Sequence, residues 1–244
     1  GMIDMEKQVV MITGASKGLG KALTLAFARK GVNLAICARG MEKLQEVKAE
    51  AEKYGVEVLA VQADVSNIRD VEKFVSLTEL TFKKVDVLIN NASILGPSPM
   101  PYLVDFPEEG FAEVLKVNIG STFLVTKRVL PLMLERNKGS IINVTSEAGN
   151  VGYAGWGAYG ISKFGVEGLT ETWADELSDT NIRVNMVDPG EMDTEMHALA
   201  VPDCDYELGD PNELVDVFLY LASDRSQHVN GQRLEAQGFS EVSI

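Results

Sequence analysis

Cysteine and histidine are scarce, because the 244-residue sequence contains only two of each. Cys37 falls in a predicted strand and Cys204 in a predicted loop, and neither has the paired spacing of a metal site or a redox motif. His197 and His228 are each isolated from other kinds of metal ligand. We therefore expect no metal site, and two unpaired cysteines fit a reducing compartment such as the cytoplasm.

Long apolar runs and an excess of basic residues are also missing. No uninterrupted apolar stretch approaches the ~18 residues of a membrane-spanning helix. The N-terminal region has no basic segment followed by a cleavage site, so we expect neither a membrane anchor nor a secretory signal. The formal charge of −14 opposes binding to nucleic acid or to anionic membranes. Any anionic ligand would depend on a local basic pocket.

The composition that remains is that of an ordinary globular protein, with 45% hydrophobic and 24% charged residues. Apolar segments of strand length alternate with segments of helical periodicity, without repeats or linkers. This alternation predicts an α/β fold with a doubly wound parallel sheet of about seven strands and helices on both faces. We expect one domain over residues 2–244, with Gly1 a remnant of an expression tag.

The expected elements follow from these patterns. The predicted strands are residues 7–13, 33–38, 57–62, 85–89, 139–144, 183–187 and 233–236. The main predicted helices begin after Gly20 and cover residues 41–54, 68–84, 107–136, 159–177 and 211–222, with interruptions of the 107–136 helix near Asn118 and Pro131.

A glycine-rich turn joins the first strand to the first helix, with the sequence Thr13-Gly-Ala-Ser-Lys-Gly-Leu-Gly20. Glycines there let the backbone approach a pyrophosphate, and the helix N-terminus offers free N–H donors. The spacing GxxxGxG differs from the general dinucleotide fingerprint GxGxxG, so the segment alone could be only a structural turn. Its position after a buried strand favours cofactor binding.

The residues after the second strand bear on which cofactor is bound. NAD-binding units usually carry an acidic residue there to bond the ribose 2′-hydroxyl, whereas this chain has Ala38 followed by Arg39. Lys17 and Arg39 could instead hold a 2′-phosphate, which predicts NADP (NADPH) rather than NAD. The alternative is that both are solvated surface cations.

A candidate catalytic group lies between residues 145 and 163. Tyr159 and Lys163 stand four residues apart in a predicted helix, so both leave one face, one turn apart. An ammonium beside a phenol stabilises the phenolate and lowers its pKa. Ser146 follows the fifth predicted strand, and its hydroxyl could meet the same substrate atom.

Five motifs occur in order along the chain: Thr13-Gly-x-x-x-Gly18-x-Gly20, Asn90-Asn91-Ala92, Ser146, Tyr159-x-x-x-Lys163 and Pro189-Gly190. In this order and spacing the sequence resembles the short-chain dehydrogenase/reductase family over nearly its whole length. Within the family it looks like the 3-oxoacyl-carrier-protein-reductase-like oxidoreductases.

The resemblance implies a Rossmann-like NAD(P)-binding domain and assigns roles to residues. Tyr159 would be the general acid in reduction and the base in oxidation. Lys163 would hold the nicotinamide ribose and lower the tyrosine pKa, and Ser146 would polarise the carbonyl. Asn118 would hold a lysine-bound water and kink its helix. The implied cofactor contacts are Gly14, Ser16, Lys17, Gly18 and Leu19 at the phosphates, Arg39 at the 2′-phosphate, Asp64 and Val65 at the adenine, Asn91 and Ala92 at the adenosine ribose, and Tyr159, Lys163, Pro189 and Thr194 at the nicotinamide end.

Two features depart from the family pattern. The substrate loop after Pro189-Gly190 covers only residues 191–209, which predicts a short lid. Seven residues could form an apolar substrate wall or could be ordinary packing: Ile94, Leu95, Tyr153, Trp156, Met192, Met196 and Leu199. Glu147 is either a solvated loop carboxylate or a group that faces the substrate and disfavours anions.

We expect an NADPH-dependent reductase of a small or medium apolar ketone or aldehyde, reversible as an alcohol dehydrogenase. The same-class alternative is a 3-oxoacyl thioester reductase that acts on acyl-carrier protein or coenzyme A esters. The predicted helix after Lys163 disfavours an acidic carrier protein, because it carries Glu167, Glu171, Asp175, Glu176 and Asp179. A second alternative is a non-catalytic NADP-binding sensor or scaffold. The resemblance also implies a homodimer or homotetramer built on the long helices.

Overall fold

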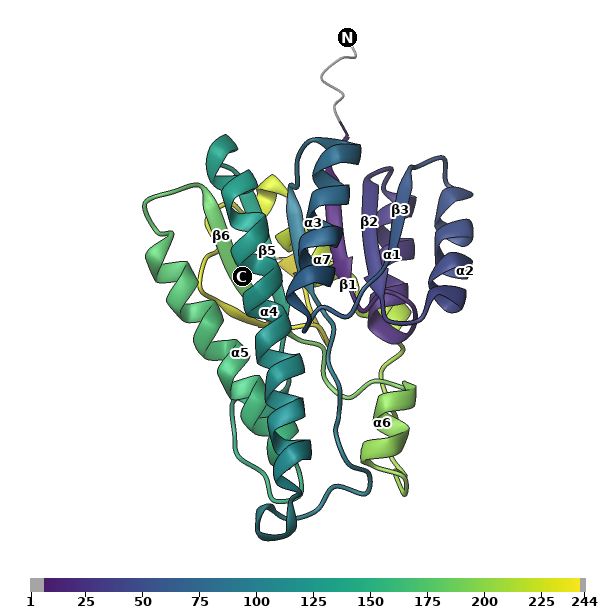
Figure 1. Cartoon of the computed structure of the whole chain (residues 1–244), viewed down its shortest axis with the longest axis vertical. Helices are drawn as coiled ribbons and strands as arrows, with labels where there is room; N and C mark the ends of the chain where they lie inside the picture. Colours follow the sequence, from purple (N-terminus) through teal and green to yellow (C-terminus); the bar gives the residue numbers. More distant parts are fainter. Residues whose placement is uncertain (1–6, 242–244) are drawn as a thin grey trace.

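The structure, a computed structural model, describes residues 7–241 and contains one seven-stranded sheet, shown in Figure 1. The strands are β1 (Val9–Thr13), β2 (Asn33–Ala38), β3 (Val58–Gln62), β4 (Val87–Asn90), β5 (Gly139–Val144), β6 (Ile182–Asp188) and β7 (Arg233–Glu235). They pair in the order β3-β2-β1-β4-β5-β6-β7, and every pair is parallel. The predicted doubly wound Rossmann-like sheet of about seven strands is confirmed.

Helices cover both faces of the sheet. Helices α1 (Gly18–Arg29), α2 (Met41–Glu52) and α7 (Asp216–Leu221) share one core cluster, whereas α3 (Ile68–Phe82), α4 (Glu108–Arg136) and α5 (Gly157–Glu176) share the other. The short α6 (Glu195–Ala200) lies below the sheet in Figure 1, apart from these two layers. The 3₁₀ helices are Leu103–Asp105, Glu147–Gly149, Pro211–Glu213 and Asp224–Ser226.

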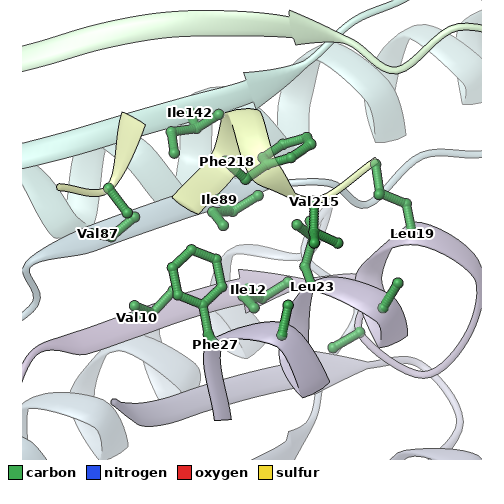
Figure 2. Close-up of a cluster of buried hydrophobic side chains, with 14 of the residues drawn as sticks. Val10, Ile12, Leu19, Leu23, Phe27, Val87, Ile89, Ile142, Val215 and Phe218 are labelled. Atoms are coloured by element: carbon green, nitrogen blue, oxygen red, sulfur yellow. The ribbon is translucent and has the colours of Figure 1, made fainter. Parts of the chain in front are cut away.

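The central strands are buried on both faces, which explains their continuous apolar sequences. In β1, Val10 and Ile12 belong to the cluster that includes Phe27 of α1 and Phe218 of α7 (Figure 2), whereas Met11 belongs to the cluster on the opposite face. Alternate side chains of a strand point to opposite faces, so one apolar run supplies both cores. All five β1 side chains are buried.

Helix α4 differs from its prediction, because it is continuous through Asn118 and Pro131. The Asn118 side chain bonds outward to Ile94 and Ser162 and does not compete for the carbonyls of its own helix. Around Pro131, the helix is packed through Val129 and other buried side chains. Tertiary packing therefore outweighs the local preference of proline for a helix break.

The predicted helix over 211–222 is also different, because it is split in two. The Asp210 carboxylate accepts the backbone N–H of Asn212 at 2.9 Å and caps a single 3₁₀ turn. Leu214 and Val215 then turn into the core beside α1, and α7 begins only at Asp216. Burial of these two apolar side chains accompanies the interruption of the helix.

The carboxyl ends of β1, β4, β5 and β6 lead into the segments that carry the candidate site residues. The winding reverses between β1 and β4, and ligands of such sheets bind in the crevice outside this point. Within residues 7–241, none of the helices combines the length and hydropathy needed to cross a lipid bilayer.

Candidate active site

The glycine turn between β1 and α1 has the backbone geometry of a phosphate cradle. Gly14 and Gly18 have φ angles of +64° and +55°, which favour glycine. A Cβ at Gly20 would collide with the carbonyl oxygen of Gly14. Lys17 is the N-cap residue of α1, and its side chain accepts no hydrogen bond from the helix. The first backbone N–H groups of α1 are therefore not capped by the Lys17 side chain. The turn therefore fits an anionic group such as a pyrophosphate.

The other predicted phosphate and ribose residues surround this turn. Ser16 is partly buried in the turn, whereas Leu19 is 4% exposed and packs into the core, so only its backbone can face a ligand. The backbone N–H groups of Asn91 and Ala92 both donate to the Thr13 hydroxyl at 3.0 Å. The Asn91 amide donates to the Gly14 carbonyl at 3.0 Å. These bonds fix the ends of β1 and β4 side by side.

The predicted adenine end carries two exposed cations. Arg39 is exposed and forms no ion pair with the described residues, whereas the Lys17 ammonium lies 3.5 Å from the Glu195 carboxylate. Partial desolvation raises the pKa of Asp64, but hydrogen bonds from Ser66 and the charges of Arg39 and Lys116 outweigh it and hold that pKa below its ordinary value. Val65 is buried, 5% exposed, in the core.

The structure brings Ser146, Tyr159 and Lys163 together at the end of β5. Ser146 follows β5, and the other two residues lie in the first two turns of α5. The Lys163 ammonium lies 5.5 Å from the centroid of the Tyr159 ring and donates to the Val144 carbonyl at 3.2 Å. Burial lowers the pKa of Lys163 to about 8. Because the lysine is only 3% exposed, its charge is shielded from water.

The prediction that Lys163 lowers the pKa of Tyr159 is wrong when only the groups of the protein itself are considered. Burial and the charge of Asp188 raise the pKa of Tyr159 to about 12, although a hydrogen bond with Ser146 opposes them. Lys163 does not reverse this shift, since its ammonium lies beside the ring and bonds to a backbone carbonyl. The tyrosine is therefore a stable phenol at neutral pH.

Asn118 of α4 lies beside this group, where it connects three segments. Its amide donates to the Ile94 carbonyl and to the Ser162 hydroxyl, both at 2.9 Å, and its carbonyl accepts the Ile94 N–H at 2.8 Å. The helix is not interrupted at Asn118, because α4 is continuous from Glu108 to Arg136. Both amide hydrogens are used, so a water on Lys163 could bond only to an Asn118 oxygen.

A buried ionic network behind Ser146 was missed from the sequence. The Arg233 guanidinium donates to the Ser146 carbonyl at 2.9 Å, to Asp188 at 3.1 Å and to Glu167 at 3.3 Å. The Thr145 hydroxyl donates to Glu167 at 2.6 Å. The expectation that Glu167 belongs to an acidic surface was wrong. Its position four residues after Lys163 could have placed it on the buried face of α5.

Pro189 and Thr194 lie on the segment that continues from β6. Pro189 is buried, and the Thr194 hydroxyl caps α6 by accepting the His197 N–H at 3.2 Å. The Thr194 methyl lies 3.6 Å from the place of a Cβ on Gly18, so this loop passes next to the glycine turn. The loop contains the short helix α6.

A cavity of about 670 Å³ adjoins Ser146. It is lined by Ser146, Glu147, Ala148, Tyr153, Trp156, Asp188, Gly190, Glu191, Tyr206, Glu207, Glu235 and Gln237. Of the predicted apolar wall, Tyr153 and Trp156 line it and the other five residues do not. Glu147 is exposed at this cavity and accepts the Tyr153 hydroxyl at 2.8 Å, a bond that raises the pKa of Tyr153. Its position fits a group that faces the substrate.

Neither histidine forms part of a metal-binding group. Among residues 7–241, no group of three or more His, Cys, Asp or Glu side chains has a geometry that could hold a metal ion. His197 is 8% exposed, and its Nε2 lies 3.1 Å from Glu191.

Comparison with known proteins agrees with this geometry. The short chain dehydrogenase family model matches residues 8–205. The chain is 37% identical to the 3-oxoacyl-[acyl-carrier-protein] reductase FabG of Thermotoga maritima, over 96% of this chain and 98% of that protein.

Two solved structures are similar over nearly their whole length. One is an Escherichia coli CFT073 protein assigned to the short chain dehydrogenases and complexed with NADPH, with a TM-score of 0.87 and 30% identity over 94% of this chain and 96% of that one. The other is NAD+-bound xylitol dehydrogenase, with a TM-score of 0.86 and 31% identity over 93% and 96% of the two chains.

The chain therefore belongs to the short-chain dehydrogenase/reductase family. It is a FabG-like oxidoreductase that interconverts carbonyl and alcohol groups with a nicotinamide cofactor.

Proposed function

We propose that this chain is an NADP(H)-dependent oxidoreductase that interconverts a carbonyl and a secondary alcohol, with Tyr159 as the acid and base. The observation that carries the proposal is the convergence of Ser146, Tyr159 and Lys163 beside a glycine turn that fits a pyrophosphate. When bound, the dihydronicotinamide supplies the hydride, and its oxidised form accepts one.

The side chains of the protein transfer the proton to and from the substrate oxygen. In reduction, the carbonyl carbon gains a hydride and Tyr159 donates its proton to the carbonyl oxygen, while the Ser146 hydroxyl donates a hydrogen bond to that oxygen. The raised pKa of Tyr159 keeps the phenol protonated before the reaction. In oxidation, the same groups act in reverse, and a tyrosinate accepts the alcohol proton. Lys163 would hold the nicotinamide ribose, with Asn118 positioning its neighbour Ser162.

Arg39 supports NADP as the preferred cofactor. Its guanidinium is exposed without an ion pair among residues 7–241, and no carboxylate occupies the preceding position, Ala38. Gly14, Ser16, Lys17, Gly18 and the Leu19 backbone would hold the phosphates, with Asp64 and Val65 beside the adenine, Asn91 and Ala92 beside the ribose, and Pro189 and Thr194 near the nicotinamide. Lys17 would exchange its contact with Glu195 for a phosphate.

The test is a parallel screen of NADPH and NADH oxidation with a panel of ketones and aldehydes. We expect turnover, with NADPH preferred by at least about tenfold in kcat/KM, which is ~1.4 kcal/mol. Equal use of both cofactors would contradict the cofactor assignment. Tight NADPH binding without turnover of any carbonyl would instead favour the sensor function.

The relationship to FabG proteins supports a second candidate, a reductase of 3-oxoacyl thioesters. The cavity at Ser146 argues against an acidic carrier protein, because its lining holds five carboxylates. Titration with acyl-carrier protein separates the two candidates. Micromolar binding would favour the thioester reductase.

An exposed apolar face supports self-association. Phe123 of α4 and both Ile161 and Phe164 of α5 are 39–46% exposed, and the Phe123 ring stacks on Trp173 at 6.0 Å. Large apolar side chains gathered on adjacent helices are typical of protein interfaces. We propose that this α4/α5 face pairs with a second copy in a homodimer or homotetramer.

Free cysteines at 37 and 204 support a cytoplasmic location.

A further inference from the structure

The cavity beside Ser146 has an unusual combination of side chains. Its lining includes three aromatic residues, Tyr153, Trp156 and Tyr206, and five carboxylates, Glu147, Asp188, Glu191, Glu207 and Glu235. None of the twelve lining residues is a lysine, arginine or histidine. The volume of about 670 Å³ is in the range of small-molecule sites.

The acidic composition of the chain does not by itself account for this lining. A second cavity of about 1240 Å³ lies at the opposite, amino-terminal edge of the sheet. It is lined by six basic residues, Lys30, Lys84, Arg136, Lys138, Arg183 and Arg225, and by four acidic ones, Asp86, Asp216, Asp224 and Glu241. Basic residues are therefore available to line cavities of this protein, but they are absent from the one at Ser146.

Most of the carboxylates at Ser146 are not neutralised by a basic side chain. Asp188 is paired with Arg233, and Glu191 lies 3.1 Å from His197. Glu147 accepts only the neutral hydroxyl of Tyr153. Glu207 and Glu235 are exposed and form no ion pair with the described residues. Three uncompensated negative charges therefore face one concave space.

The lining of this cavity favours cationic ligands over anionic ones. A cleft lined by charges of one sign concentrates the field and raises the local concentration of ions of opposite sign. The π-faces of tyrosine and tryptophan also attract cations, above all quaternary ammonium groups. An anionic group would be repelled by the carboxylates and would find no basic partner in the lining.

We infer that the substrate of this enzyme is a cationic carbonyl compound or alcohol, with an ammonium group a few bonds from the reacting carbon. The inference rests on the proposed function, since Ser146 defines where the reacting oxygen lies. The carbonyl oxygen binds at Ser146 and Tyr159, and the ammonium group lies among Glu147, Tyr153 and Tyr206. Reduction consumes one NADPH and one proton and leaves the ammonium group unchanged.

Three methyl ketones with the same three-carbon spacer test the inference. They end in a trimethylammonium group, a tert-butyl group and a carboxylate, so the first two share shape and differ in charge. With NADPH, we expect kcat/KM for the ammonium ketone to be at least about tenfold higher than for the tert-butyl ketone. We expect kcat/KM for the carboxylate ketone to be about tenfold lower than for the tert-butyl ketone. Both ratios should shrink as added salt screens the charges.

Glutamine variants connect the preference to the cavity. In the double variant Glu147→Gln with Glu207→Gln, the ratio of kcat/KM between the ammonium and tert-butyl ketones should fall toward one. Glu46→Gln removes the same type of charge from an exposed position on α2, so it should leave the ratio unchanged. Both altered cavity residues are exposed, so the fold should persist.

A binding measurement keeps this inference separate from the proposed function. The alcohols that correspond to the ammonium and tert-butyl ketones are titrated against the protein while tryptophan fluorescence is recorded. The control Trp156→Phe keeps only Trp173 and should lose the change in fluorescence that comes from Trp156. Tighter binding of the ammonium alcohol supports the inference even if none of the ketones is reduced, an outcome that would count against the proposed function. Turnover with equal or better use of the tert-butyl or carboxylate ketone overturns the inference and leaves the proposed function intact.

Discussion

The proposed role of Lys163 requires a charged ammonium, whereas the burial of this side chain disfavours the charge. Burial lowers its pKa from the ordinary 10.5 to about 8. Between these values the unfolded chain keeps a proton that the folded chain has lost. Unfolding therefore takes up a proton in this window, and the contribution of the lysine to the free energy of unfolding rises with pH.

We predict that the ligand-free wild type gains stability relative to Lys163→Met between about pH 8 and pH 10.5. The difference in the free energy of unfolding should grow by up to ~1.4 kcal/mol per pH unit. Urea denaturation of both proteins at several pH values measures it, and groups common to both cancel. A difference that stays constant across this window would show that the lysine titrates normally.

Arg233 is the residue that neutralises the carboxylates behind Ser146. Its removal would leave Asp188 and Glu167 buried without their partner. We predict that Arg233→Ala lowers the free energy of unfolding by about 3 kcal/mol, the usual cost of breaking a buried ion pair. The exposed Arg69→Ala serves as the control and should change stability by less than ~0.5 kcal/mol in the same urea titration. Similar values for both variants would contradict a structural role of the network.

At the scale of elements, the glycine turn between β1 and α1 is the segment that we propose to hold the cofactor phosphates. A Cβ at position 20 would meet the backbone carbonyl of Gly14, which cannot move without disturbing the end of β1. We predict that Gly20→Ala weakens NADPH binding by at least about tenfold, ~1.4 kcal/mol, as measured by calorimetry. Gly168→Ala, where a Cβ would meet no atom within 4 Å, is the matched control. Unchanged affinity in Gly20→Ala would mean that the turn does not hold the phosphates.

The sequence predicts most elements because buried strands and amphipathic helices leave clear patterns. The apolar run of β1 and the pairing of Tyr159 with Lys163 on one helix face follow from local periodicity alone. The continuous α4 and the split before α7 do not, because long-range packing around Pro131 and Leu214 decides them. The ion pair between Glu167 and Arg233 could not be predicted from local periodicity either, because the two residues lie 66 positions apart in the chain.

At the scale of the whole molecule, the α4/α5 face determines the proposed assembly. A charge placed on this face would have to be buried without a partner when two copies pair. We predict that Phe164→Asp converts the dimer or tetramer to monomers, measured by light scattering at micromolar concentration. Leu80→Asp, an equally drastic change at a 66% exposed position of α3, should leave the assembly unchanged. A wild-type monomer would remove the proposal.

Charge distribution is also a property of the whole molecule. With a formal charge of −14, the protein nevertheless places basic residues at the amino edge of the sheet and carboxylates beside Ser146. The two cavities thus differ in charge, and the one beside Ser146 is the negative one. This difference underlies the proposed choice of a cationic substrate and the argument against an acidic carrier protein.

In the proposed mechanism, Tyr159 donates the proton to the carbonyl oxygen during reduction. The most direct measurement is the rate of NADPH oxidation with a ketone that the wild type reduces, compared between the wild type and Tyr159→Phe at saturating cofactor. We predict that the variant binds NADPH with near wild-type affinity and loses at least about a hundredfold in kcat, which is the scale of general acid catalysis. Wild-type kcat in Tyr159→Phe would show that Tyr159 is not the proton donor.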